Sequence, residues 1–352
     1  MKAKYIMYKN IPIVRSFGYD VDILDFDKLP FCLKTPDLDF DMIFHGWTES
    51  RIMNIGRTNA KAITDSLGIS SKNLYAIGEI LHFIQFTDCY WMKSEDENIS
   101  WEEVSPYTNF LSEQLSNVSL TGKIADLRHL VTTDHLRSPD LGAQGMSAKC
   151  LVKEADGLYL YKVSRKEIAA SELLDDLGVS HVKYEAVTPE QLDMVADKDR
   201  QDDISKRGET VSRCKIICNE DLSLLSWGDF CTYCDLNGKD PYEELPTERF
   251  HEMNIADYII GNNDRHIDNW GFTVENFQIT GLHPLMDHDH AFSNDELICQ
   301  TMDKPMSLHD AAILGLKNID RTIPQKLDKP DLLTLDEWSM VEKRLTDIAH
   351  PC

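Results

Sequence analysis

The sequence predicts an α+β fold from three observations. Residues 150–164 (CLVKEADGLYLYKVS) form two alternating apolar runs that meet at Asp156-Gly157, the pattern of a β-hairpin. Residues 165–178 (RKEIAASELLDDLG) have the pattern of a helix that ends at a glycine. Residues 250–261 (FHEMNIADYIIG) predict an amphipathic helix that also ends at a glycine, and a second hairpin centred on Glu275-Asn276 follows it.

Composition excludes several classes of protein. The chain has 352 residues, 42% of them hydrophobic and 27% charged, which is ordinary for a globular protein of two or three domains. The formal net charge of -24 repels phosphates and anionic lipids. We therefore expect no direct nucleic-acid binding and no membrane binding. Because no apolar leader or run of membrane-spanning length occurs, the expected location is cytoplasmic.

The first third of the chain, residues 1–120, is predicted to be a mainly helical accessory region. Helices are expected at 58–67 and 72–86, and the acidic stretch 93–103 is expected to be a solvated loop. The helix pair with its LGIS turn could be a helix-turn-helix, but the acidic charge favours packing or partner binding. The role of this region is not assigned by the sequence.

The nine cysteines are scattered and odd in number, which indicates reduced thiols rather than a disulfide framework. Four of them could be two halves of a zinc site: Cys214, Cys218, Cys231 and Cys234. The first pair is spaced one residue too widely, and no glycine follows either pair to make the tight turn. The favoured interpretation is four ordinary buried cysteines, with CKIIC in a β-strand.

A candidate phosphate site begins at the glycine-containing loop 142–149 (GAQGMSAK), which precedes the first hairpin. Lys162 shares a strand face with apolar residues, so it needs a partner if it is buried. Glu172 stands four residues after Ile168 on the next helix and is expected to turn inward. This combination is how kinases hold nucleotide phosphates. The alternative is a surface lysine on an edge strand.

The stretch 259–272 (IIGNNDRHIDNWGF) carries the second candidate site. Asp264 and Asn269 lie five residues apart after a helix, and Asp287 follows the second hairpin. Phosphoryl transfer needs a carboxylate for the acceptor hydroxyl, with amide and carboxylate oxygens for magnesium. The residue types and their order therefore predict phosphoryl-transfer chemistry.

Together with LHPLMDHDHAF at 282–292, this stretch resembles the catalytic core of the HipA-like serine/threonine kinases. The two motifs stand in the family's order, and GAQ at 142–144 resembles the start of its phosphate loop. The similarity covers about residues 120–350. It implies a two-lobed protein-kinase-like fold, with a small lobe at 121–220 and a large, mainly helical lobe at 221–352.

The resemblance also implies the cofactors ATP and Mg²⁺, a protein substrate, autophosphorylation and an antitoxin-like protein partner. Asp264 resembles the catalytic aspartate, and His266 a histidine of the catalytic loop that braces it by hydrogen bonding. The favoured alternative for His266 is a structural loop histidine without a chemical role. Asn269 and Asp287 resemble the magnesium ligands. The residues that would bind the nucleotide are Lys162, Glu172, Gly142, Ala143, Gln144, Gly145 and Lys149, and Ser147 is the candidate autophosphorylation site.

Two rival functions are weighed against the kinase. A metallohydrolase would use Asp287, His288, Asp289 and His290, but alternate residues of an extended strand point to opposite faces, so both histidines cannot easily join Asp287. A catalytically inactive module that binds nucleotide or a partner would be expected to have lost residues of the motif. Asp264, Asn269, Asp287 and Lys162 are all present.

Overall fold

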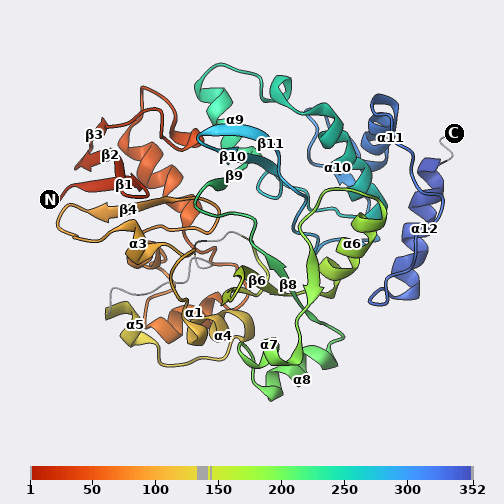
Figure 1. The fold of residues 1–352 in the computed structure, drawn as a ribbon, viewed down its shortest axis with the longest axis horizontal. Helices are drawn as coiled ribbons and strands as arrows, with labels where there is room; N and C mark the ends of the chain where they lie inside the picture. The colour runs from red at the N-terminus through yellow and green to blue at the C-terminus, as the bar shows by residue number, and fades with distance from the viewer. Residues whose placement is uncertain (1, 133–141, 143–144, 350–352) are drawn as a thin grey trace. The chain divides into compact units, whose positions relative to one another are not determined.

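The structure is a computed structural model that describes residues 2–132, 142 and 145–349 (Figure 1). The chain divides into two compact units. Unit 1 comprises 1–163, 187–223 and 275–277, and unit 2 comprises 164–186, 224–274 and 278–352. Helices and strands occur in both units, so the predicted α+β class is confirmed.

Unit 1 begins with an antiparallel sheet of order β3-β2-β1-β4. Its strands are β1 (Lys4–Tyr8), β2 (Ile11–Phe17), β3 (Asp20–Ile23) and β4 (Tyr90–Ser94). Alternate apolar side chains of this sheet, among them Ile6 and Ile13, are buried against the short helical turns that follow. These turns are η1 (Phe31–Leu33), η2 (Met42–Trp47) and η3 (Glu49–Arg51). The prediction of a mainly helical N-terminal region missed this sheet.

The helices of the N-terminal region are shorter than predicted. They are α1 (Ala60–Leu67), α2 (Tyr75–Ile80), α3 (Trp101–Val104), α4 (Glu113–Thr121) and α5 (Arg128–Thr132). The helix expected over 72–86 ends early because His82 and Phe83 adopt φ values of 52° and 54°, which no α-helix contains. Ile63 of α1 and Ile77 of α2 are buried in one cluster with Leu115 of α4, so both helices pack inside unit 1.

The acidic stretch 93–103 is only partly a loop. Residues 95–98 are exposed, as predicted. Ser100 then begins α3 with a capping box to Glu103, and Trp101 is buried. The buried indole anchors this stretch to unit 1.

The first predicted hairpin is confirmed in unit 1. Strands β5 (Lys149–Glu154) and β6 (Gly157–Val163) pair antiparallel, and Glu154 lies opposite Gly157 across the turn. β6 also pairs with β8 (Val211–Lys215), so β6 has a neighbour on each side. Two helices lie between β6 and β8 in the sequence of this unit, α7 (Pro189–Asp193) and α8 (Lys198–Lys206).

Unit 2 is built from helices and short strands. Its helices are α6 (Arg165–Asp176), α9 (Trp227–Leu236), η5 (Pro241–Glu244), α10 (Thr247–Ile260), α11 (Leu308–Asn318) and α12 (Leu335–Ala349). Its strands are β7 (Tyr184–Ala186), β9 (Leu222–Ser226, which starts in unit 1), β10 (Gly271–Glu275), β11 (Gln278–Leu282), β12 (Ile298–Cys299) and β13 (Met306–Ser307). Helix α10 packs against α11 and α12.

The second predicted hairpin is also confirmed, one residue later than expected. β10 pairs with β11, and β9 extends the sheet. Asn276 and Phe277 form the turn with φ values of 48° and 62°, as a two-residue hairpin turn with two left-handed positions requires. Within the described part of the chain, no helix has both the length and the apolar content needed to cross a membrane.

Candidate functional site

The loop that carries Asp264 starts where α10 ends. Residues 253–260 of α10 are all buried, so this helix is enclosed rather than amphipathic as predicted. Gly261 ends it with a φ of 65°, a left-handed conformation that glycine adopts at no steric cost. The amide of Asn262 then donates to the carbonyl of Asp257 at 2.9 Å, which turns the chain back across the helix end.

Arg265 is the buried centre of this loop. Its guanidinium forms two hydrogen bonds of 2.9 Å with the carboxylate of Asp257 on α10. Its Nη1 donates to the carbonyl oxygens of Asn269, at 2.9 Å, and of Met286, at 2.5 Å. One side chain thus connects α10, the loop and the segment that leads into Asp287.

The charge of Arg265 is maintained in this buried setting. Burial lowers the pKa of Arg265, but the carboxylates of Asp257, Asp287 and Glu167 raise it, and the result is a pKa above its usual value. A buried bidentate pair of this kind is costly to break, because the remaining charge would be left without compensation.

The loop places its predicted residues in different environments. Asn269 is buried, and its amide nitrogen donates to the carbonyl of Asp264 at 2.8 Å, so its amide oxygen is the atom suited to hold a cation. The carboxylate of Asp264 is partly exposed and lies 3.9 Å from Nε2 of His290. His266 accepts a hydrogen bond from the amide of Asp268 at 3.2 Å. This contact lies within the loop, and the bracing role of His266 stays a prediction.

Asp287 is part of an acidic cluster in unit 2. Its φ of 60° is left-handed, a conformation that costs a non-glycine residue about 1–2 kcal/mol and that concentrates at functional sites. Carboxylate oxygens of Asp287, Asp289 and Glu167 all lie within 4.8 Å of one another. The backbone amide of Asp287 donates to the hydroxyl of Tyr184 at 3.2 Å.

Glu167 is the residue of this cluster that was not predicted from the sequence. It lies on α6, is fully buried, and accepts a hydrogen bond from the amide of His288 at 2.7 Å. Glu172, which was expected to turn inward from the same helix, is exposed, and that prediction is wrong. The part of its side chain that is covered, and then repulsion by Asp331 and Asp176, raise the pKa of Glu172.

A sequence signal for Glu167 did exist. The buried face of α6 includes Glu167, Ala170, Ser171 and Leu174, which are spaced as one helical stripe. A stripe counted from Ile168, which is also buried, predicts Glu172 as the inward glutamate, more than one turn too late.

The cluster suits a hard divalent cation. Its donors are all oxygens, the ligands that Mg²⁺ and Ca²⁺ prefer. Histidines do not complete it: His288 is fully buried, and its Nδ1 lies 3.3 Å from the guanidinium of Arg265. Across the described residues, this cluster is the group with metal-binding geometry, and it contains no cysteine. Cys214 and Cys218 are buried, and Cys231 and Cys234 lie on α9.

The predicted phosphate site falls in unit 1. Lys162 lies on β6 directly opposite Lys149 on β5, and both lysines are buried. The alternative of a surface lysine on an edge strand is therefore wrong. Residues directly opposite in an antiparallel pair share a face, where two like charges repel unless counter-charges or an anion compensate them. Two lysines on one strand face are a chemical basis for the predicted phosphate site.

The loop before β5 supports the same interpretation. Gly145 has a φ of 96°, and a Cβ added there would lie 2.6 Å from the ammonium of Lys149. Glycine therefore lets this lysine approach the loop backbone. Gly142 is described by the structure, whereas Ala143 and Gln144 lie outside the described residues. Ser147 is partly buried just before β5.

No family model and no curated protein matches the sequence. Among solved structures, the chain is similar to HipA of the Shewanella oneidensis MR-1 toxin–antitoxin system, solved with HipB and operator DNA. The identity is 12%, the TM-score is 0.52, and the match covers 98% of this chain and 96% of that one. The chain has a HipA-like kinase fold.

A second solved structure is similar over a smaller part of the chain. The Helicobacter pylori proinflammatory kinase CtkA is 15% identical, with a TM-score of 0.40. The match covers 57% of this chain and 89% of CtkA. The fold assignment therefore depends on the HipA match alone.

Proposed function

We propose that this HipA-like protein is an ATP- and Mg²⁺-dependent serine/threonine protein kinase. Its reaction would transfer phosphate to a protein hydroxyl, and autophosphorylation, with Ser147 as a candidate, is one form of it. One observation carries the proposal. Arg265 binds the carbonyls of Asn269 and Met286 from a single buried position, so the loop of Asp264 and the segment of Asp287 share one support.

Each predicted residue has a role in this proposal. The carboxylate of Asp264 would orient the acceptor hydroxyl and accept its proton. Asn269 and Asp287 would hold Mg²⁺, which neutralises charge on the phosphates during transfer. Lys162 and Lys149 would contact nucleotide phosphates. Glu167 takes the place of Glu172 as the acid of α6 that belongs to the site.

The test is Asp264→Asn in a phosphoryl-transfer assay with radiolabelled ATP and Mg²⁺. Loss of the carboxylate should reduce transfer by about 10²-fold or more, while ATP affinity and melting temperature change little. Asp268→Asn is the matched control, because Asp268 is an exposed aspartate of the same loop. It should keep full activity.

Two results would oppose the proposal. Equal activity of wild type and Asp264→Asn would remove Asp264 from the chemistry. Wild-type protein that binds ATP but labels neither itself nor any protein in a lysate would favour the inactive nucleotide-binding or partner-binding module instead.

A partner is part of the same proposal. The similar HipA was solved together with HipB and operator DNA. By this likeness, an antitoxin-like protein is the kind of partner we propose for this chain. The net charge of -24 supports binding through such a protein rather than direct contact of this chain with DNA.

A further inference from the structure

Three described residues of the glycine-containing loop, Gly142, Met146 and Lys149, are held by the N-terminal region of unit 1. The side-chain amide of Gln85 donates to the carbonyl of Gly142 at 2.9 Å. The backbone amide of Thr58 donates to the carbonyl of Met146 at 2.7 Å. The guanidinium of Arg57, which is buried, donates to the carbonyl of Lys149 at 2.6 Å. All three acceptors are backbone carbonyls, so the contacts hold the backbone itself at these three residues.

Two other backbone segments lie so close to Gly142 that this position has no room for a side chain. A Cβ at this position would lie 2.9 Å from the carbonyl oxygen of Arg51 and 3.0 Å from that of Ile84. Gln85 reinforces the contact, because its amide nitrogen donates to the carbonyl of Ser50 at 2.9 Å as well as to Gly142. The first glycine of the loop therefore lies directly against the N-terminal region.

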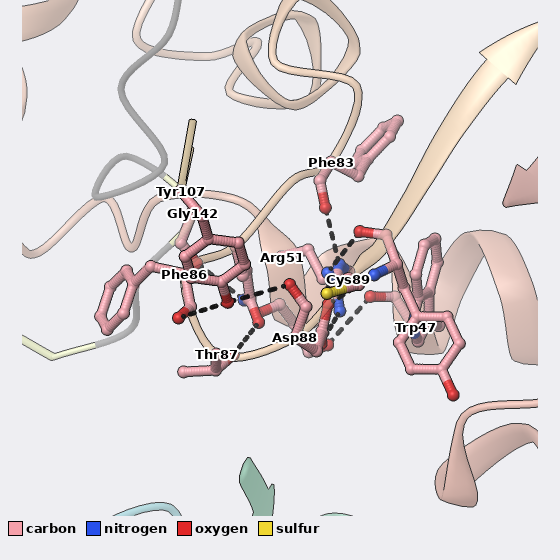
Figure 2. A network of polar contacts seen from close by, with 12 residues as sticks. Trp47, Arg51, Phe83, Phe86, Thr87, Asp88, Cys89, Tyr107 and Gly142 are labelled. Carbon is pink, nitrogen blue, oxygen red and sulfur yellow. Dashed lines mark hydrogen bonds and ion pairs between the residues drawn. The ribbon is translucent and has the colours of Figure 1, made fainter. Parts of the chain in front are cut away.

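A network of polar contacts centred on Arg51 lies behind Gly142. Arg51 is buried and forms a bidentate pair with Asp88, with bonds of 2.8 and 2.7 Å. Its Nε donates to the carbonyl of Phe83 at 2.6 Å, and its guanidinium lies 4.5 Å from the ring of Trp47. Figure 2 shows this network together with Gly142. Buried, fully bonded networks of this kind hold one conformation.

From these contacts we infer that the N-terminal region is a brace for the glycine-containing loop. It sets the affinity for nucleotide phosphates through Gln85, Arg57 and the amide of Thr58. The inference depends on the proposed kinase function and gives its accessory region a role. Gln85 and Arg57 are positioning residues, because they act through the loop backbone.

A planar trans peptide explains how the brace would work. In such a peptide the carbonyl and the following N–H point in opposite directions. The carbonyl of Met146 is bound by Thr58, so the N–H of Ser147 points away from the brace. Oriented N–H groups of loops are what bind phosphate oxygens. A loop held in this way is already ordered before the nucleotide binds, so binding does not lose the conformational entropy of ordering it.

The test compares Gln85→Glu with wild type. A carboxylate cannot donate to the carbonyls of Gly142 and Ser50 and repels both. We expect the Kd and the KM for MgATP to rise about fivefold or more, with kcat at saturating ATP nearly unchanged. Hydrogen exchange of the amides at 145–149 should become faster. Gln114→Glu, an exposed glutamine on α4, adds the same charge to unit 1 and should change neither readout.

Arg57→Lys tests the other end of the loop, with exposed Arg207→Lys as its control. The shorter, single-headed ammonium should also raise the KM for MgATP and speed exchange near Lys149. If this buried variant does not fold, Gln85→Glu at its partly exposed position decides alone. The exchange readout needs no enzymatic activity.

The inference is overturned if Gln85→Glu leaves both loop exchange and MgATP affinity as in wild type, or if it lowers kcat with KM unchanged. Failure of the kinase proposal looks different, because the wild type itself would then transfer no phosphate. In that case slower exchange in wild type than in Gln85→Glu would still support the brace.

Discussion

Glu167 and Glu172 are two glutamates of the same helix with opposite environments. Glu167 is fully buried within 4.8 Å of the carboxylate oxygens of Asp287 and Asp289, whereas Glu172 is exposed. Three carboxylates this close repel one another unless a cation or protons compensate them. Glu167 therefore belongs to a candidate cation site, whereas Glu172 belongs to the acidic surface.

We predict that Glu167→Gln weakens stabilisation by Mg²⁺. In wild type, Mg²⁺ should raise the melting temperature by mass action, since it binds the native state. The rise should shrink by at least half in Glu167→Gln and stay unchanged in the matched control Glu172→Gln. Thermal unfolding at constant ionic strength measures both. An undiminished Mg²⁺ effect in Glu167→Gln would exclude Glu167 from the cation site.

His283 predicts a pH dependence of stability. It is 5% exposed, and burial, with a contribution from Arg265, lowers its pKa from 6.5 to about 4. Between these two values the unfolded chain binds a proton that the folded chain excludes, so folding loses stability as the pH falls from 6.5 to 4. The loss attributable to His283 is up to about 3 kcal/mol.

The variant His283→Gln should flatten this slope. Urea unfolding at several pH values between 4 and 7 gives the free energy of unfolding for each protein. His45→Gln, at an exposed histidine, should keep the wild-type slope. A slope that is as steep in His283→Gln as in wild type would assign the acid sensitivity to other groups.

Strand β10 shows how an element positions the loop before it. Trp270 and Phe272 flank Gly271 and are buried, and Trp270 stacks on Trp227 with ring centroids 4.4 Å apart. Because Trp270 directly follows Asn269 in the chain, this stacking fixes the backbone next to Asn269. Gly271 itself lies so close to β9 that an added Cβ would be 2.1 Å from the carbonyl oxygen of Leu225.

Gly271→Ala should therefore separate β10 from β9 and disturb Asn269. We expect a destabilisation of about 3 kcal/mol or more, because backbone and not a flexible side chain blocks the methyl group. Gly281→Ala on β11 is the matched control: its φ of 150° is similar to the 157° of Gly271, and its Cβ would meet nothing within 4 Å. Urea unfolding measures both variants. Equal losses would mean that φ, and not the contact with β9, governs the effect.

The charge of the whole molecule predicts its response to salt. The chain carries 60 acidic and 36 basic residues. Self-repulsion at a net charge of -24 weakens the compact state, and salt screens it, with a Debye length of about 10 Å at 0.1 M. The urea midpoint should therefore rise between 20 mM and 500 mM NaCl. A midpoint that falls would mean that favourable ion pairs outweigh the excess negative charge.

Local patterns determined the elements that carry the candidate site residues. Turn chemistry at Asp156-Gly157, a glycine after each helix and alternating apolar runs predicted both hairpins, α6 and α10, because these signals act over a few residues. Asp264, Asn269 and Asp287 were selected by type and spacing. The N-terminal sheet was missed, since its strand β4 pairs with β1 across more than 80 residues of sequence.

Only the tertiary structure decided which polar side chains are buried together. Two glutamates five residues apart on a helix point in directions that differ by more than a quarter turn, so only one of them can face Asp287. Glu167 is that residue, because the face of α6 that is buried depends on what packs against the helix. The pairing of Arg265 with Asp257, and of Gln85 with Gly142, likewise joins groups that no local pattern relates. Local sequence cannot predict these contacts, because the burial of a side chain and its close contacts depend on residues that are distant in sequence.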